Sequence, residues 1–334
     1  MKRIAINGFG RIGRLAARIL LTRARSDMEL VAINGTGEAT QNALLLEYDS
    51  NYGPMAHRVG AQGAALTYQG QSIPVFNSRD PLALDWSGLG IDLVMECTGA
   101  FNTRDAAAQH LTAGADKVLI SSPGTHVDRT IVYGVNHKDL QASDLIVSNA
   151  SCTTNCLAPV AKVLDHELGI IRGTMSTIHA ATGDQNLIDG RHNDPRRGRA
   201  AGQSLVPTST GAAKAIGAVL PQLDGRLHGT AMRVPTATVS MIDLVFNSKK
   251  KTSVAEVNAI FAAAAHSPEL RGVLAYNDRP LVSVDFKGNP ASAIFDATQT
   301  AVLDDDMVRV AAWYDNEWAF AERMIDTASA MLQI

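Results

Sequence analysis

The stretch Arg3-Ile4-Ala5-Ile6-Asn7-Gly8-Phe9-Gly10-Arg11-Ile12-Gly13-Arg14 stands at the start of the chain and decides its fold. A short β-rich run leads into a glycine turn, and an amphipathic stretch follows as far as about Thr22. Strand, glycine turn and helix is the order typical of phosphate binding. Here Gly8 permits the tight turn, Gly10 lets the backbone approach a pyrophosphate, and Gly13 lets the helix pack closely on the strand. The helix N-terminus offers N–H groups and a positive dipole end to phosphates. We therefore expect a dinucleotide site.

Further apolar runs alternate with longer segments that are compatible with helices. They lie at 29–33, 91–95, 117–120 and 145–148. This alternation predicts an α/β fold with a mostly parallel, doubly wound sheet of the Rossmann type. After residue 150 the pattern changes to strands that favour a mixed or antiparallel sheet and an α+β domain. These strands are expected at about 170–179, 227–233, 237–246, 280–286 and 307–314.

The chain length of 334 residues favours two domains, because single cores rarely grow beyond about 250 to 300 residues. We expect a dinucleotide-binding domain of residues 1–150, to which a C-terminal helix at about 317–334 is added, and a catalytic domain of residues 151–316. Between its strands, the long polar segment 180–207 is rich in Gly and Arg. A loop of that length in a compact enzyme is usually functional or packed against a partner.

Composition limits the classes of function. The net charge of −3 gives no general reason to bind nucleic acid or an anionic membrane, and the chain has no run of about 18 apolar residues. Cys97, Cys152 and Cys156 are an odd set that does not form a disulfide framework and lacks metal-ligand spacing. We expect a cytoplasmic protein with no metal, no membrane partner and no nucleic-acid partner.

The segment Ser148-Asn149-Ala150-Ser151-Cys152-Thr153-Thr154-Asn155-Cys156 follows an apolar strand and opens a helix-compatible stretch. A helix N-terminus stabilises a cysteine thiolate, and an adjacent imidazole would lower the pKa of the thiol further and act as base. Among nine histidines, His179 at the end of the strand 170–178 is the best candidate for that base. From the residues alone, Cys152 as core filling and His179 as a loop cap remain open alternatives.

Several motifs in the same order give the chain a resemblance to the glyceraldehyde-3-phosphate dehydrogenase family. They are Asn7 to Arg14, Ser148 to Asn155, Thr182-Gly183-Asp184-Gln185, Pro207-Thr208-Ser209-Thr210-Gly211-Ala212-Ala213-Lys214, Met232-Arg233-Val234-Pro235-Thr236 and Trp313-Tyr314-Asp315-Asn316-Glu317-Trp318. The resemblance implies phosphorylating oxidation of D-glyceraldehyde 3-phosphate to 1,3-bisphosphoglycerate. Cys152 would attack the aldehyde, His179 would act as base, and inorganic phosphate would cleave the resulting thioester.

The resemblance also implies the binding residues and the assembly. Phosphate groups would be held by Ser151, Thr153, Thr182, Thr210, Gly211 and Arg233. NAD or NADP would be held by Gly8, Gly10, Arg11, Ile12, Gly13, Gly35, Thr36, Arg79, Ser121, Arg191 and Asn316, with Arg11 and Ile12 at the pyrophosphate loop, Arg79 and Ser121 near the adenine and nicotinamide ends, and Asn316 on the carboxamide. The family is typically a homotetramer, in which a segment resembling 180–207 lies against the neighbouring subunit's cofactor.

The chain departs from the family pattern at the tip of its second strand. An acid there normally holds the ribose 2′-hydroxyl, whereas this strand ends in Asn34-Gly35-Thr36-Gly37 and Glu38 lies in the loop beyond. Arg191 stands where many NAD-using relatives have Pro. Loss of a negative charge and gain of a positive one both favour a 2′-phosphate. We hypothesise that NADP is accepted; a neutral Gly and a solvated Arg are the alternative explanation.

A second departure bears on the substrate. Ala319 and Phe320 replace the usual Gly-Tyr, and erythrose-4-phosphate dehydrogenases resemble this chain there. Because both phosphate motifs are intact, the three-carbon substrate is favoured over that alternative. An inactive homologue that binds nucleotides or RNA is an alternative of another class. It predicts loss of the nucleophile, base or phosphate donors, and all of these are present.

Overall fold

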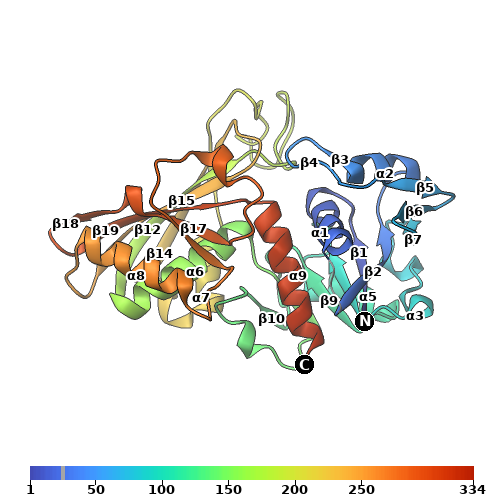
Figure 1. Cartoon of the computed structure of the whole chain (residues 1–334), viewed down its shortest axis with the longest axis horizontal. Coiled ribbons are helices and arrows are strands. Elements are labelled where there is room, and N and C mark those ends of the chain that lie inside the picture. Colours follow the sequence, from blue (N-terminus) through green and yellow to red (C-terminus); the bar gives the residue numbers. More distant parts are fainter. Residues whose placement is uncertain (24–26) are drawn as a thin grey trace. The chain divides into compact units, whose positions relative to one another are not determined.

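The computed structural model describes residues 1–23 and 27–334 (Figure 1). Its contacts divide the chain into two compact units. The first comprises Met1–Ser151 and Ala321–Ile334, and the second comprises Cys152–Phe320. No helix among the described residues has the length and apolar character needed to cross a membrane.

The first unit contains a nine-stranded sheet in the order β10-β11-β9-β8-β1-β2-β7-β6-β5. Its strands are β1 (Lys2–Asn7), β2 (Met28–Asn34), β5 (Gly60–Gln62), β6 (Ala65–Tyr68), β7 (Gln71–Phe76), β8 (Leu93–Glu96), β9 (Lys117–Ile120), β10 (Arg129–Thr130) and β11 (Ile146–Ser148). The strands from β10 to β7 pair in parallel, as the alternating pattern predicted. Residues 60–76 add an antiparallel edge that the sequence analysis did not anticipate.

Helices connect these strands, and α1 packs on β1 and β2. The helices of this unit are α1 (Arg11–Thr22), α2 (Ala39–Glu47), α3 (Trp86–Leu89), α4 (Arg104–Ala107) and α5 (Gln109–Thr112), with short helices η1 (Pro81–Ala83) and η2 (His137–Asp139) and a small strand pair β3 (Tyr48–Asp49) and β4 (Gly53–Pro54). Most of the C-terminal helix α9 (Trp318–Leu332) also belongs to this unit, where Thr327 donates to the Asn149 side chain at 2.7 Å.

Glycine controls the turn between β1 and α1. Gly8 has φ +98°, and a Cβ added to Gly13 would lie 2.0 Å from the Gly8 carbonyl oxygen. Gly13 therefore permits the close approach of helix and strand, because any larger residue would push α1 away from the turn. A Cβ added to Gly10, by contrast, would have no atom within 4 Å.

The second unit contains an eight-stranded mixed sheet in the order β13-β14-β12-β15-β19-β17-β16, with β18 paired to β19. Its strands are β12 (Ile170–Ala180), β13 (Val206–Ser209), β14 (Leu227–Val234), β15 (Ser240–Ser248), β16 (Leu274–Asn277), β17 (Ala293–Asp296), β18 (Ala301–Leu303) and β19 (Met307–Tyr314). Its helices are α6 (Cys152–Glu167), α7 (Ala212–Val219) and α8 (Val254–His266), with η3 (Pro221–Leu223), η4 (Ser283–Phe286) and η5 (Ala297–Gln299). Buried and partly exposed residues alternate strictly along β15, as expected for a strand with one face in the core. This alternation is the pattern from which the sequence predicted strands in this half of the chain.

One predicted strand of this unit is wrong. Residues 280–286 do not form a strand, and 283–286 form the short helix η4. The Val282 N–H donates to the Asp285 carboxylate at 2.9 Å, and this local bond favours a helical turn over sheet pairing. The pairing in this region is made instead by β16 and β17, which run parallel to each other.

Replacing Gly13 by Ala tests the close approach of α1 to the glycine turn. We expect Gly13→Ala to lower the free energy of unfolding by about 1 to 3 kcal/mol, because the new methyl group overlaps the Gly8 carbonyl. Gly10→Ala is the matched control and should change stability by less than about 0.5 kcal/mol. Denaturant unfolding of both variants gives the comparison, and equal stabilities would contradict the proposed packing role.

Candidate functional site

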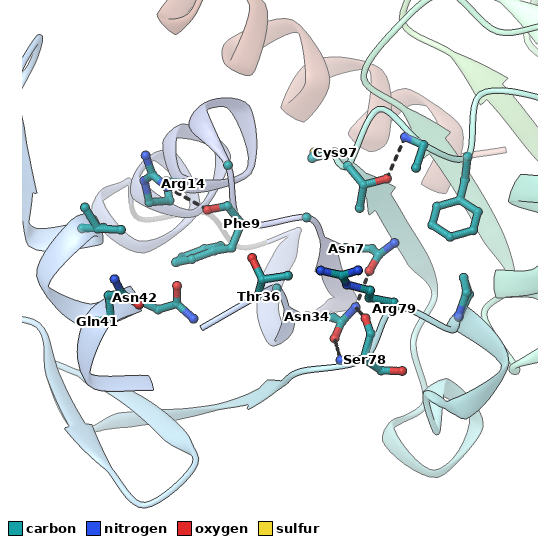
Figure 2. Close-up of a pocket in the computed structure, with 18 residues that line it drawn as sticks. Asn7, Phe9, Arg14, Asn34, Thr36, Gln41, Asn42, Ser78, Arg79 and Cys97 are labelled. Carbon is teal, nitrogen blue, oxygen red and sulfur yellow. Dashed lines mark hydrogen bonds between the residues drawn. The ribbon is translucent and has the colours of Figure 1, made fainter. Parts of the chain in front are cut away.

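A pocket of about 640 Å³ lies at the carboxyl ends of four parallel strands of the first unit (Figure 2). Asn7 and Asn34 close β1 and β2, whereas Ser78 and Cys97 follow β7 and β8. Ligands of open α/β sheets bind at this edge, and the volume is ordinary for a cofactor site. The pocket therefore lies where the glycine motif predicts a dinucleotide.

The glycine turn presents its backbone to this pocket. Gly8 and Gly10 both line it, and Gly10 is the N-cap of α1 with no hydrogen bond from a side chain. Because Gly10 has open space on its Cβ side, a ligand can approach the backbone there. The first turn of α1 contains no acidic residue that would repel a phosphate.

The structure brings together some of the predicted cofactor residues and not others. Gly8, Gly10, Gly35, Thr36 and Arg79 line the pocket. Arg11, Ile12, Gly13 and Ser121 are not among its lining residues, and Arg191 and Asn316 belong to the second unit. The Arg11 guanidinium forms a two-pronged ion pair with Asp49, at 2.5 and 3.1 Å, so its side chain is committed there.

The pocket carries positive charge and no described carboxylate along its lining. Among the described residues that line it, Arg14 and Arg79 carry charge, and none is Asp or Glu. Glu38 lines a separate hollow of about 290 Å³. Gly35 also has a steric role, because an added Cβ would lie 2.8 Å from the Phe9 Cβ.

The second unit holds the predicted nucleophile and base as a contacting pair. Cys152 is the first residue of α6, and His179 stands at the penultimate position of β12. The Cys152 Sγ lies 3.4 Å from the His179 Nε2, a distance that permits proton transfer between them. His179 is 4% exposed, while Cys152 is only partly covered. The arrangement is that of an activated thiol that a substrate can reach.

Burial and nearby positive charge set the ionisation of this pair. Burial and, after it, the Arg233 guanidinium lower the pKa of His179 to about 3, so the imidazole is a neutral base. Burial raises the pKa of the Cys152 thiol, whereas Arg233 and hydrogen bonds from Thr153 act in the opposite direction. The thiol is therefore protonated in the resting pair and needs the imidazole to accept its proton.

Strand register explains why Arg233 lies beside His179. The two residues are direct partners in the parallel pair of β12 and β14. The Arg233 Nη1 lies 2.8 Å from the His179 Nδ1 and donates to the Thr182 hydroxyl at 3.1 Å. The backbone carbonyl of Ala180 is 2.7 Å from the same His179 nitrogen. The sequence motifs predicted that Arg233 and Thr182 are functional, but only the structure shows that Arg233 contacts both His179 and Thr182.

Two buried donors beside this cluster lack an acceptor. Neither the Arg233 Nε nor the Gln185 Nε2 has a hydrogen-bond partner among the described residues. The Gln185 Oε1 accepts from the Thr182 N–H at 3.3 Å, which orients the amide nitrogen away from that contact. Buried donors without partners are costly, and an anion bound there would satisfy both.

The remaining predicted phosphate residues occupy different surroundings. The Thr153 hydroxyl contacts the Tyr314 hydroxyl at 2.8 Å, which in turn contacts Thr177 at 2.9 Å. Thr210 accepts from the Ala212 N–H at 3.2 Å, and Gly211 is the N-cap of α7. Ser151 falls in the first unit. Thr153 is thus engaged in the core, whereas Thr210 and Gly211 stand at a helix N-terminus.

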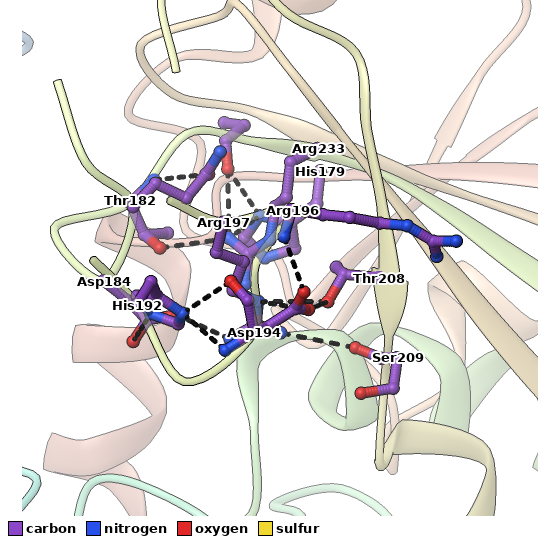
Figure 3. Close-up of polar contacts among 12 residues, drawn as sticks. His179, Thr182, Asp184, His192, Asp194, Arg196, Arg197, Thr208, Ser209 and Arg233 are labelled. Atoms are coloured by element: carbon purple, nitrogen blue, oxygen red, sulfur yellow. Dashed lines mark hydrogen bonds and ion pairs between the residues drawn. The ribbon is translucent and has the colours of Figure 1, made fainter. Parts of the chain in front are cut away.

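The long polar loop is held by its own ion pairs (Figure 3). Arg197 donates to Asp184 at 2.6 Å and to the Thr208 hydroxyl at 3.0 Å, and Thr208 donates to Asp194 at 2.7 Å. Arg199 pairs with Asp189 at 3.0 Å. Half of the basic cluster Arg191, Arg196, Arg197 and Arg199 is therefore neutralised within the loop, which weakens any nucleic-acid interpretation. No group of three His, Cys, Asp or Glu residues placed to hold a metal occurs in residues 1–23 and 27–334.

Sequence reasoning missed the polar residues that hold the dinucleotide pocket in place. Asn34 donates to Asn7 at 2.6 Å and to the Ser78 carbonyl at 2.9 Å. Glu96 and His110 lie buried in contact with Asn7. The sequence signal that could have revealed these residues is Glu96, a carboxylate at the end of an otherwise apolar strand. A buried carboxylate needs hydrogen-bond partners from neighbouring segments.

Fold and sites together define a class, the dinucleotide-binding oxidoreductases that act through a cysteine. Comparison with known proteins makes this specific. Residues 2–104 match the model of the glyceraldehyde 3-phosphate dehydrogenase NAD-binding domain, and residues 151–316 match the C-terminal domain of the same enzyme. The chain therefore belongs to the glyceraldehyde-3-phosphate dehydrogenase family, whose members are NAD(P)-dependent.

Curated relatives cover the chain almost completely. Glyceraldehyde-3-phosphate dehydrogenase of Zymomonas mobilis is 52% identical over 330 residues, which is 98% of each chain. The enzyme of the same name from Pseudomonas aeruginosa is 54% identical over 330 residues, again 98% of each chain. Glyceraldehyde-3-phosphate dehydrogenase 2 of Trichormus variabilis is 49% identical over 335 residues, which is 100% of this chain and 99% of the relative.

Removing the charge of Arg233 should change the reactivity of Cys152. We expect Arg233→Met to move the midpoint of the pH profile for Cys152 alkylation upward by about one pH unit, because the nearby cation favours the thiolate. Iodoacetamide labelling followed by mass spectrometry measures it. Cys97 gives little background, since burial and Glu96 raise its pKa to about 12.

Arg226→Met is the matched control for this experiment. Arg226 donates to the Ile170 carbonyl, at the opposite end of β12 from His179. Its loss should leave the labelling profile of Cys152 unchanged. A profile that is the same in wild type and in Arg233→Met would contradict electrostatic control of the thiol by Arg233.

Proposed function

We propose that the protein catalyses the phosphorylating oxidation of D-glyceraldehyde 3-phosphate with NAD⁺ or NADP⁺, giving 1,3-bisphosphoglycerate and the reduced cofactor. The observation that carries the proposal is the Cys152–His179 pair at 3.4 Å with Arg233 and Thr182 directly behind it. A thiol, a neutral imidazole and a buried guanidinium together suit acyl transfer to an anion.

The thiol chemistry follows from this geometry. The Cys152 thiol loses its proton to the His179 Nε2 and adds to the aldehyde carbon, giving a hemithioacetal. His179 returns this proton to the former aldehyde oxygen, which becomes the hydroxyl of the hemithioacetal, and accepts it again as the carbon is oxidised to a thioester. A bound nicotinamide dinucleotide supplies the hydride acceptor for this oxidation. Inorganic phosphate attacks the thioester carbon, and the carbon–sulfur bond breaks with its electron pair on the Cys152 sulfur, which takes back the proton from His179 as the acyl phosphate leaves.

Anion recognition in this reaction needs donors near the nucleophile. Arg233 and Gln185 each contribute a buried donor without an acceptor, and Thr182 adds a hydroxyl in contact with Arg233. We assign Thr182 and Arg233 to one phosphate. We assign Thr210 and Gly211 to the other, together with Ser151 and Thr153. Charge-assisted bonds from a guanidinium suit phosphate oxygens.

Asn316 is suited to hold the carboxamide of the cofactor because its amide has a defined orientation. The Ser240 hydroxyl accepts from the Ala180 N–H at 3.0 Å and donates its own proton to the Asn316 Oδ1 at 2.9 Å. This leaves the Asn316 amide nitrogen as the group available to an acceptor. A carboxamide oxygen is such an acceptor.

NADP acceptance is part of the proposal. The pocket is lined by Arg14 and Arg79 but by no carboxylate among its described residues, and Thr36 at its rim is exposed. A 2′-phosphate therefore meets positive charge where an acid would normally repel it. Arg191, which is exposed on the long loop, would add a further positive charge by the family resemblance.

A kinetic matrix tests the activity. Glyceraldehyde 3-phosphate and erythrose 4-phosphate are each combined with NAD⁺ and NADP⁺, with and without phosphate, while the reduced cofactor is followed by absorbance. We expect phosphate-dependent turnover with the three-carbon aldehyde. Cys152→Ser should lower kcat by at least about 10³-fold, because the covalent intermediate is lost. The matched control Cys156→Ser, at a buried thiol that does not contact the base, should retain activity.

The outcomes of this matrix separate the alternatives. Preference for the four-carbon aldehyde would favour erythrose-4-phosphate oxidation, and no turnover with any pair would favour an inactive nucleotide-binding homologue. Steady turnover that does not need phosphate, or full activity of Cys152→Ser, would overturn the thioester mechanism.

Cofactor choice is tested by placing an acid at the strand tip. Gly35→Asp should lower kcat/KM with NADP⁺ relative to NAD⁺ by about tenfold or more, because the carboxylate repels the 2′-phosphate. Gly35→Ala is the matched control, since it brings the same Cβ against Phe9 without charge. If both variants show the same cofactor ratio, charge at residue 35 does not select the cofactor.

We also propose a homotetramer that works in the cytoplasm. Large apolar side chains stand exposed on the polar loop, with Leu187 81%, Ile188 76% and Leu205 67% exposed. Apolar groups gathered on an otherwise polar segment favour a protein contact, and the family resemblance implies a neighbouring subunit there. The three free cysteines fit a reducing compartment. The substrate and inorganic phosphate are the expected small-molecule partners.

Charging this apolar surface tests the assembly. We expect Leu187→Asp together with Ile188→Asp to dissociate the tetramer, because burying a carboxylate in an apolar contact is costly. Light scattering coupled to size-exclusion chromatography measures the mass. Leu303→Asp, at an exposed residue of β18, is the matched control and should leave the mass unchanged. Wild type running as a monomer would contradict the proposal.

A further inference from the structure

Beneath the dinucleotide pocket lies a buried acid that the proposed chemistry does not use. Glu96 ends β8 and is 1% exposed, and His110 on α5 is fully buried against it. The His110 Nε2 lies 3.1 Å from a Glu96 oxygen, and the Asn7 amide donates to the same oxygen at 2.5 Å. The other oxygen accepts from the Thr98 N–H at 2.7 Å and from the Thr98 hydroxyl. One carboxylate thus collects donors from several segments.

Donor-only groups fix the direction of the hydrogen bonds on both sides of Glu96. On one side the Trp86 indole N–H donates to the His110 Nδ1 at 3.1 Å. An indole cannot accept, so the His110 proton lies on Nε2 and points to Glu96. His110 is therefore a neutral imidazole with a single possible tautomer in this setting.

On the other side of Glu96, a series of hydrogen bonds begins at the backbone N–H of Ser78. Ser78 N donates to the Asn34 Oδ1 at 3.0 Å, and Asn34 then donates to the Asn7 Oδ1 at 2.6 Å (Figure 2). Asn7 in turn donates to Glu96. Neither amide can be turned over, because that would set two donors against each other. The two series of hydrogen bonds therefore bring the N–H groups of Asn7 and His110 to the same Glu96 oxygen. A carboxylate, which only accepts, satisfies both donors.

This network runs along the floor of the pocket. Asn7, Asn34, Ser78 and Thr98 all line the pocket, while Glu96, His110 and Trp86 lie behind it. Asn34 also donates to the Ser78 carbonyl at 2.9 Å, which holds the segment that carries Arg79. Because a fully satisfied buried network rigidifies its members, the pocket walls are held in one arrangement before a ligand arrives.

We infer that Glu96 is a positioning residue for cofactor binding, whose buried carboxylate anchors the hydrogen-bonded floor of the dinucleotide pocket. The inference rests on the proposed function insofar as this pocket is taken to bind the dinucleotide. Glu96 does not itself line the pocket and acts through Asn7 and Thr98, which do. Its removal should therefore raise the dissociation constant and KM of the dinucleotide while leaving the alkylation rate of Cys152 unchanged.

The test is a double-mutant cycle in the full-length chain, read by calorimetric titration with NAD⁺ and with NADP⁺. Glu96→Gln places an NH₂ group against the donors of Asn7 and His110, and we expect at least about tenfold weaker binding with kcat retained. Asn7→Asp places two carboxylates in contact and should weaken binding similarly. The double variant moves the single charge from residue 96 to residue 7.

The geometry predicts that the double variant recovers binding. The Asn7 Nδ2 lies 3.2 Å from the His110 Nε2 and 2.5 Å from the Glu96 oxygen. A carboxylate oxygen introduced at that place by Asn7→Asp accepts both from His110 and from the amide introduced by Glu96→Gln. The second oxygen of the new carboxylate keeps the bond from Asn34, and the carbonyl of the new amide keeps those from Thr98. Affinity within about threefold of wild type is expected, since the lost bonds are replaced one for one.

Each outcome decides between the hypotheses. Wild-type affinity in Glu96→Gln, or a double variant no better than the weaker single one, overturns the positioning role while the proposed function stands. Failure of wild type to bind either dinucleotide overturns the proposed function and this inference with it. If Glu96→Gln alone does not fold, comparing Asn7→Asp with the double variant still measures whether the second change restores binding.

Discussion

Buried polar groups must find hydrogen-bond partners, and this constraint acts most strongly where apolar strands end. In the first unit it operates at Asn7, Asn34 and Glu96, which close β1, β2 and β8. In the second unit it operates at His179 and Arg233, near the ends of β12 and β14. Parallel pairing brings such ends to one edge of a sheet, so satisfying them creates a preorganised polar site.

The electrostatics of the cysteine site follow from burial and from nearby positive charge, chiefly that of Arg233. Burial disfavours both the thiolate of Cys152 and the protonated imidazole of His179. Arg233 favours the former and opposes the latter, so the pair rests as a thiol beside a neutral base. The same guanidinium keeps an unused Nε for an anion. By the proposed function, one residue would link ionisation of the nucleophile to recognition of phosphate.

The dinucleotide pocket shows a different use of charge. Glu96 lies behind the lining residues and is contacted by four donors, while the described lining residues bear positive charge at Arg14 and Arg79. A negative charge is thus used to organise the floor without facing the ligand phosphates. Gly35, which lines the pocket, brings no carboxylate to it.

The sequence by itself determined the fold class, the parallel part of the first sheet, the mixed character of the second, the family and the order of the motifs, because strand periodicity, glycine spacing and residue types are local properties. It misread residues 280–286, where the Val282–Asp285 bond favours a turn over strand pairing. Only the tertiary structure decided that Arg233 contacts His179, that Arg11 pairs with Asp49, and that Glu96 anchors the pocket floor. These contacts join residues 38 to 89 positions apart, and no local pattern specifies them, since strand register and burial arise from packing of the whole unit.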